Sequence, residues 1–223
     1  MPRTPYPPPT PEENLEWAEK ADREFFDKLL DPKVWVSAAD DLLLAASIIR
    51  PHVELYWKNI FDRLQPGADR TPPDWTNSRL IGALSLLVAY ALENLLKALI
   101  VKRDDGGIAT PLAKKYHARA KKRRGKQRVD AKADDFGLPP DLAKHDLNEL
   151  ANLAVVTLDR FEADLLERLT QAVVWSGRYR IPRGANAYAS KGTTTTSSDF
   201  EIADRVILRI RHAIVEFAPE KGE

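Results

Sequence analysis

The 223-residue sequence contains no cysteine, which excludes disulfide bonds, cysteine-ligated zinc and a cysteine nucleophile. The net charge is only +1, so the whole chain has no bias towards nucleic acid or membrane surfaces. There is no Gly-rich phosphate loop, no His-Glu-x-x-His pair and no nucleophile elbow, and the four histidines lack metal-ligand spacing. The sequence therefore predicts no metal and no cofactor. The absence of cysteine suits a reducing compartment, and we expect a cytoplasmic protein.

Strand-like alternation and internal repeats are also lacking, whereas apolar residues recur at helical spacing along most of the chain. This pattern predicts an all-α bundle with long loops. Residues 1–11 hold a run of prolines and no apolar signal core, so we expect an extended arm there. Residues 12–218 are long enough for one core, and we expect them to form one helical domain.

The longest apolar run is Leu80–Val101, which is long enough to cross a bilayer. Its second half contains Glu93, Asn94 and Lys97, and charges are costly in lipid. We therefore expect no membrane span here. The run instead predicts the buried central helix of the bundle.

Helices are expected at this run and on either side of it. Capping residues, prolines and glycines place them at 11–30, 37–64, 78–103, a short stretch from 141 or 144, 159–176 and 198–217. Pro51 predicts a kink or a break in the second helix, and Ser198 with Glu201 predicts a capping box at the start of the last. Leu44, Ile48 and Leu153 are among the residues expected to point into the core.

A basic run covers residues 114–128, with nine Lys or Arg and no acid, inside a charged segment at 106–137 that we expect to be a loop. In one interpretation the run is a solvated loop, ordered or not. In the other it binds the phosphates of RNA. The candidate phosphate-binding residues are Lys121, Lys122, Arg123 and Arg124.

Two charged pairs are also candidate binding residues. Glu93 and Lys97 lie one helical turn apart, which suits either a surface ion pair or a polar patch set into a buried helix and facing a cleft. His145 and Asp146 open a helix, either as a simple cap or as part of such a patch.

A third candidate is the segment Trp175–Pro182, which ends a helix and turns into an extended stretch. Its aromatic residues suit anchoring of the following loop onto the bundle. Alternatively, Arg178, Arg180 and Arg183 rim a cleft that binds an anion, and Arg178 and Tyr179 are the candidate binding residues of this segment.

Three segments together resemble bacterial HEPN-domain proteins: AYALENLLKALIV at 89–101, KHDLNELA at 144–151 and WSGRYRIP at 175–182. The resemblance covers about residues 80–215 and leaves out the proline-rich start and 31–77. It implies an elongated helical bundle that forms homodimers. It also implies a place in toxin–antitoxin, defence or RNA-processing systems, in which some members accompany a nucleotidyltransferase.

Catalytic members of that superfamily carry an Arg, four to six residues, and then a His. They cleave RNA without metal. Arg205 and His212 match this spacing, two turns apart on one helix, although Val206 stands where active relatives carry a polar residue. An imidazole and a guanidinium suit proton transfer and charge stabilisation at a phosphate.

Three functions from different classes remain open at this point. The first is a non-catalytic protein that binds RNA or a nucleotide-handling partner. The second is a metal-independent endoribonuclease that uses Arg205 and His212. The third is a protein–protein interaction module whose basic segment contacts an acidic partner.

Overall fold

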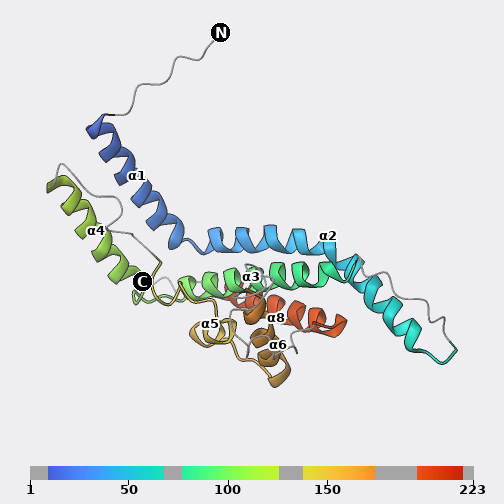
Figure 1. The fold of residues 1–223 in the computed structure, drawn as a ribbon. Coiled ribbons are helices and arrows are strands. Elements are labelled where there is room, and N and C mark those ends of the chain that lie inside the picture. The colour runs from blue at the N-terminus through green and yellow to red at the C-terminus, as the bar shows by residue number, and fades with distance from the viewer. Residues whose placement is uncertain (1–9, 68–76, 126–137, 174–194, 218–223) are drawn as a thin grey trace, which may run out of the picture. The chain divides into compact units, whose positions relative to one another are not determined.

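In a computed structural model of the chain, residues 10–67, 77–125, 138–173 and 195–217 are described (Figure 1). These residues form seven α-helices, and no described residue lies in a β-strand. The prediction of an all-α fold is therefore confirmed. The expected proline-rich arm falls almost wholly outside the described residues.

The chain divides into two compact units, which are described separately. The first comprises residues up to Asp31 together with 104–140, and the second comprises 32–103 together with the residues from Asp141 onwards. Two compact units can belong to one domain, so the expected single domain over 12–218 stays a prediction.

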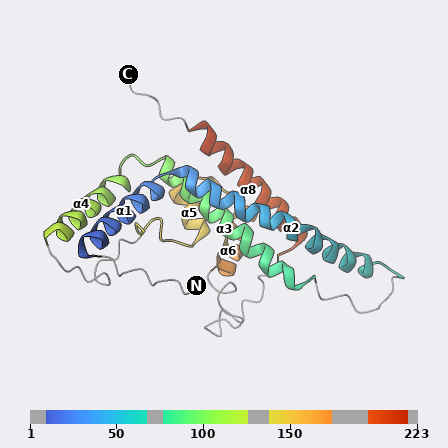
Figure 2. The ribbon, with the colours of Figure 1, turned by 90° about the horizontal axis from the view of Figure 1, so that it is seen from above.

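The first unit consists of α1 (Pro11–Leu29) and α4 (Ala109–Gly125), which lie side by side in both views (Figure 2). Helix α1 begins with a capping box, because Thr10 and Glu13 each accept a hydrogen bond from the other's backbone N–H. The rings of Phe26 and Tyr116 lie 5.3 Å apart between the two helices. The Arg119 guanidinium also pairs with the Asp22 carboxylate at 2.9 Å.

The expectation of a basic loop is wrong for residues 109–125, which form helix α4. Alanine, lysine and arginine are good helix formers, and this composition outweighs the lack of an apolar stripe. The Asp104 carboxylate also accepts hydrogen bonds from the N–H groups of Ile108 and Ala109, both at 2.8 Å, at the start of the helix. Residues 126–137 lie outside the described part of the chain.

The second unit is built around α3 (Arg79–Lys102). The side chains of Leu92, Leu95, Leu96 and Leu99 are fully buried, which confirms the predicted central helix. Four other helices pack against it: α2 (Pro32–Leu64), α5 (Leu147–Leu153), α6 (Arg160–Gln171) and α8 (Ser197–Glu216). Although α3 is long and apolar enough to cross a membrane, 78% of its apolar window is buried inside the protein, as in the core helix of a soluble protein.

Helix α2 extends through Pro51 without the break that was one expected outcome. Its second half runs in a different direction from its first half, as Figure 1 shows. Leu44 and Ile48 were expected in the core but are exposed, as is Leu153 on α5. A helix covered on one side buries only part of its apolar residues, and the spacing alone does not say which part.

Short polar caps begin the remaining helices. The carboxylate of Asp146 accepts from the Glu149 N–H, and that of Asp159 accepts from the Glu162 N–H, both at 2.9 Å. Helix α8 begins one residue before the expected Ser198. The N-cap of α8 is Thr196, and its backbone N–H donates a hydrogen bond to the carboxylate of Asp199, rather than to Glu201, at 2.7 Å.

Candidate functional site

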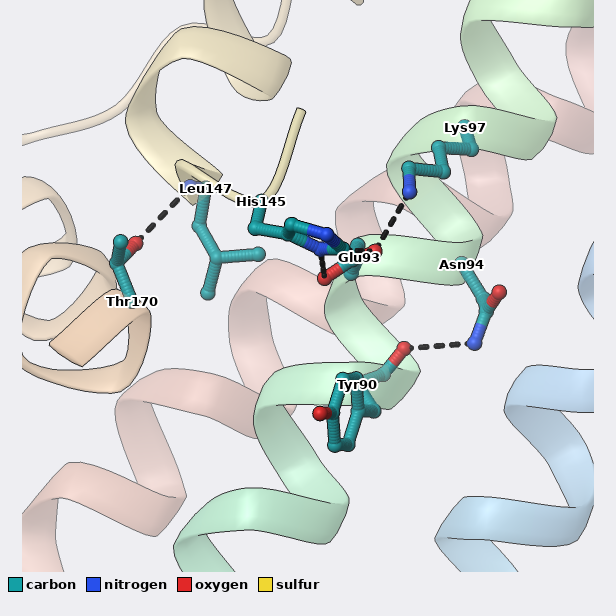
Figure 3. Close-up of polar contacts among 7 residues, drawn as sticks. All are labelled: Tyr90, Glu93, Asn94, Lys97, His145, Leu147 and Thr170. Atoms are coloured by element: carbon teal, nitrogen blue, oxygen red, sulfur yellow. Dashed lines mark hydrogen bonds and ion pairs between the residues drawn. The ribbon is translucent and has the colours of Figure 1, made fainter. Parts of the chain in front are cut away.

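The candidate site is a polar cluster of Glu93, Lys97 and His145 in the second unit (Figure 3). Glu93 and Lys97 lie one turn apart on α3, and the ammonium of Lys97 donates to the Glu93 carboxylate at 2.6 Å. His145, which precedes α5, places its Nδ1 3.1 Å from both oxygens of the same carboxylate. Glu93 therefore joins a cation on its own helix to an imidazole from a segment 52 residues later.

The Glu93–Lys97 pair is buried: Lys97 is 2% exposed and Glu93 is 6% exposed. The interpretation of a surface ion pair is therefore wrong. The pair forms a polar patch within a buried helix, and the cleft expected beside it stays a prediction. His145 is different, because 47% of its side chain is open to solvent. The cluster thus reaches the surface through the imidazole.

Trp35 on α2 completes the surroundings of Lys97, with its ring centroid 5.6 Å from the ammonium nitrogen. An aromatic face attracts a cation, and this attraction grows when water is excluded. Sequence reasoning missed Trp35, since nothing in the spacing of α2 marks it as the neighbour of a residue 62 positions away. A buried lysine ammonium that pairs with one carboxylate still has other N–H groups to stabilise, and the aromatic ring of a neighbour can do this.

The cluster can hold an imidazole in a fixed orientation. When the neutral His145 donates its Nδ1–H to Glu93, its Nε2 carries a free lone pair on the half-exposed ring. Such a nitrogen can accept a proton or a hydrogen bond from a ligand. The same contacts also fasten the segment before α5 to α3, which is a structural role.

Asp146 does not join the cluster, because its carboxylate caps α5 through the Glu149 N–H. The capping interpretation is thus confirmed for Asp146, whereas His145 turns to Glu93. Nearby, Thr170 accepts from the Leu147 N–H at 2.9 Å and Asn94 donates to the Tyr90 carbonyl at 2.8 Å (Figure 3). These contacts link α5 to α6 and satisfy the polar side chain of Asn94.

Arg205 and His212 are both exposed on α8. The Nδ1 of His212 lies 3.1 Å from the carboxylate of Glu216, one turn further along α8. Arg209, which lies between them in sequence, binds the buried Glu162 through two nitrogens, at 2.8 and 2.7 Å. No contact joins Arg205 to His212 in the described part of the chain, and their catalytic role stays a prediction.

The other predicted residues are only partly placed. Lys121 is exposed on α4. Lys122, Arg123 and Arg124 belong to the same helix, but their side chains lie outside the described part of the structure, as do Arg178 and Tyr179. Among the described residues, no group of three His, Cys, Asp or Glu side chains is arranged to hold a metal ion.

The chain matches no protein-family model, no curated protein and no solved structure. The resemblance to HEPN-domain proteins therefore stays a prediction that rests on the three quoted segments.

Proposed function

We propose that this protein is a cytoplasmic, helical RNA-binding protein that contacts phosphates through α4 and has no catalytic activity of its own. The observation that carries the proposal is the basic surface of α4. Lys114, Lys115, His117 and Lys121 are exposed on it. No acidic residue occurs between Asp105 and Asp130 in the sequence, and on the neighbouring α1 Asp22 pairs with Arg119 of α4.

The packing of α4 supports this role. Tyr116 and Arg119 face α1, where they meet Phe26 and Asp22. The remaining lysines are thereby left on the solvent side of a regular helix. Cations held along a helix can neutralise several phosphates at once, which yields binding that is independent of base sequence and sensitive to salt. A place in a bacterial defence or toxin–antitoxin system follows only from the HEPN resemblance and belongs to the same proposal.

Replacing Lys114, Lys115 and Lys121 with glutamine tests the proposal. We expect weaker binding to every single-stranded RNA, whatever its base sequence. The slope of log affinity against log salt concentration should flatten by up to about 0.7 for each lost contact. Fluorescence anisotropy with labelled RNAs at several salt concentrations measures both quantities.

A matched control removes the same charge elsewhere, through Lys20→Gln, Lys28→Gln and Arg160→Gln, all of which are exposed. This control should bind RNA nearly as the wild type does. If the two triple variants lose affinity equally, overall charge rather than α4 drives binding. If neither loses any, the basic surface is a solvated helix and the proposal fails.

The endoribonuclease alternative is tested in the same samples. If Arg205 and His212 cleave RNA, labelled RNA should shorten during incubation, even in EDTA, and His212→Ala should abolish this. Our proposal predicts intact RNA with both proteins. Cleavage that depends on His212 would show that the protein is an enzyme and not only a binding protein, because the His212 imidazole would then transfer protons during RNA cleavage.

A further inference from the structure

A series of three aromatic rings leads from the contact between α1 and α4 to the surface of the first unit. The centroids of the Phe26 and Tyr116 rings lie 5.3 Å apart. The Tyr116 ring then meets the His117 ring at 5.4 Å, with an angle of 67° between the two planes. His117 is exposed, so the series ends in solvent. Edge-to-face contacts between aromatic rings are favourable, and this one restrains the orientation of the imidazole.

Tyr116, the middle ring of the series, is also held through its hydroxyl. The Arg23 guanidinium of α1 donates a hydrogen bond to this oxygen. Arg23 lies three residues before Phe26, so the two contacts come from neighbouring positions on α1. Because Tyr116 is held through both its ring and its hydroxyl, it gives the imidazole a rigid support. A side chain that is already ordered loses little entropy when it binds a ligand.

His117 lies among the lysines that we propose to bind phosphates. Lys114 precedes it by three residues and Lys121 follows it by four, so the three side chains share one side of α4. All three are exposed. At 1.5 Å per residue, the two lysines lie about 10 Å apart along the helix, and the imidazole lies between them. A strand whose phosphates pair with both lysines therefore passes the imidazole.

A planar ring between cations can recognise a part of RNA that the cations do not contact. Lysines bind phosphates, which RNA carries whether or not its bases are paired. An exposed aromatic ring can stack on the flat face of a base, and histidine is one of the side chains that do so on single-stranded RNA. In a duplex the base faces are covered by neighbouring bases, so this contact is open only to an unpaired base.

We propose that His117 forms a base-stacking site, in which its imidazole, supported by Tyr116, stacks on one unpaired base of the RNA that α4 binds. The site depends on the proposed RNA binding by α4 and makes single-stranded RNA its substrate class. Every base has an aromatic face, so stacking tolerates changes of base sequence. The site therefore distinguishes unpaired from paired bases, and not one base from another.

An abasic strand tests the stacking site, because it keeps the phosphates of a single strand and lacks the bases. The wild type should bind single-stranded RNA at least about fivefold more tightly than an abasic strand of equal length, as expected for one stacked base. His117→Ala should lose this preference by weakening the binding of RNA alone. Its affinity for the abasic strand and for an RNA duplex should equal that of the wild type. Fluorescence anisotropy at one salt concentration measures all these affinities.

Two further variants separate the ring of His117 from its charge. His117→Phe keeps an aromatic ring and cannot carry a charge, so it should retain the preference for RNA over the abasic strand. His117→Lys adds a cation and removes the ring. It should therefore bind the abasic strand more tightly than the wild type does, without recovering the preference for RNA.

Trp17→Ala is the matched control for an exposed aromatic side chain in the same unit. Trp17 is 76% exposed on α1. It lies five residues before Asp22 and nine before Phe26, which places it on the side of α1 that faces away from α4. This variant should keep the wild-type preference for RNA over the abasic strand.

Failure of the stacking site and failure of RNA binding by α4 give different results. Equal affinity of the wild type for RNA and for the abasic strand would reject stacking and leave phosphate binding in place. A preference that survives His117→Ala, or that Trp17→Ala removes, would also reject the site. If the protein binds neither strand, both proposals fall. Circular dichroism should show unchanged helix content, and a His117→Ala protein that loses helix is replaced by His117→Gln, for which the same results are expected.

Discussion

Replacing Glu93 with leucine is expected to lower the free energy of unfolding by about 3–5 kcal/mol. Glu93 is the carboxylate that neutralises Lys97, whose ammonium is almost fully buried and touches Trp35 on its other side. Without Glu93 the cation stays in the interior with only an aromatic face to stabilise it. Urea denaturation followed by circular dichroism measures the loss.

The double variant Glu93→Leu, Lys97→Met is the decisive control. Buried ion pairs can often be replaced by apolar side chains of similar size at little cost, so the double variant should recover most of the stability. His145→Ala should cost only about 1 kcal/mol, because the imidazole is half-exposed and Lys97 keeps its carboxylate. Two results would show that Glu93 and Lys97 are not energetically coupled. One is a Glu93→Leu protein as stable as the wild type, and the other is a double variant no more stable than Glu93→Leu.

Replacing Arg209 with methionine is expected to cost about 2–3 kcal/mol at neutral pH. The Arg209 guanidinium makes two hydrogen bonds to Glu162, whose side chain is almost fully buried between α6 and α8. Methionine keeps an unbranched apolar stem and removes the charge and the nitrogens that donate to Glu162. Among the described residues, the Glu162 carboxylate then retains only the hydrogen bond from the Asp159 N–H.

This second variant also has a predicted pH dependence. The hydrogen bonds from Arg209 hold the pKa of Glu162 below its usual value of 4.5. A carboxyl group with a lowered pKa in the folded protein stabilises it above the ordinary pKa, and this stabilisation is lost as the pH falls through the lowered value. The difference between wild type and Arg209→Met should therefore be largest above about pH 4.5 and shrink in acid. A difference independent of pH would contradict the role given to Glu162.

Much of the fold followed from local patterns. The long apolar run of Leu80–Val101 predicts the buried helix, and the helix starts expected at 11 and 159 lie within one residue of the observed Pro11 and Arg160. These features are local, since each depends on residues within a few positions of one another. High charge density predicts a loop at 109–125, whereas the structure has a helix there, because Lys and Arg favour helices.

The candidate site was only half predictable. The spacing of Glu93 and Lys97 showed that they share a face, but whether this face is buried depends on α2, which covers it from a distant part of the chain. His145 was singled out as a helix opener, and no sequence pattern indicated that it contacts Glu93 52 residues earlier. Long-range pairings of this kind are set by tertiary packing, which local spacing does not encode.

The most direct test of the proposed function is a titration of the intact wild-type protein with a labelled single-stranded RNA at increasing salt concentrations. With at least three lysines of α4 on phosphates, we predict binding at about 50 mM salt and a slope of log affinity against log salt of about −2 or steeper. The slope should be similar for RNAs of unrelated sequence. No binding at low salt, or a slope near zero, would contradict the proposal that α4 binds RNA.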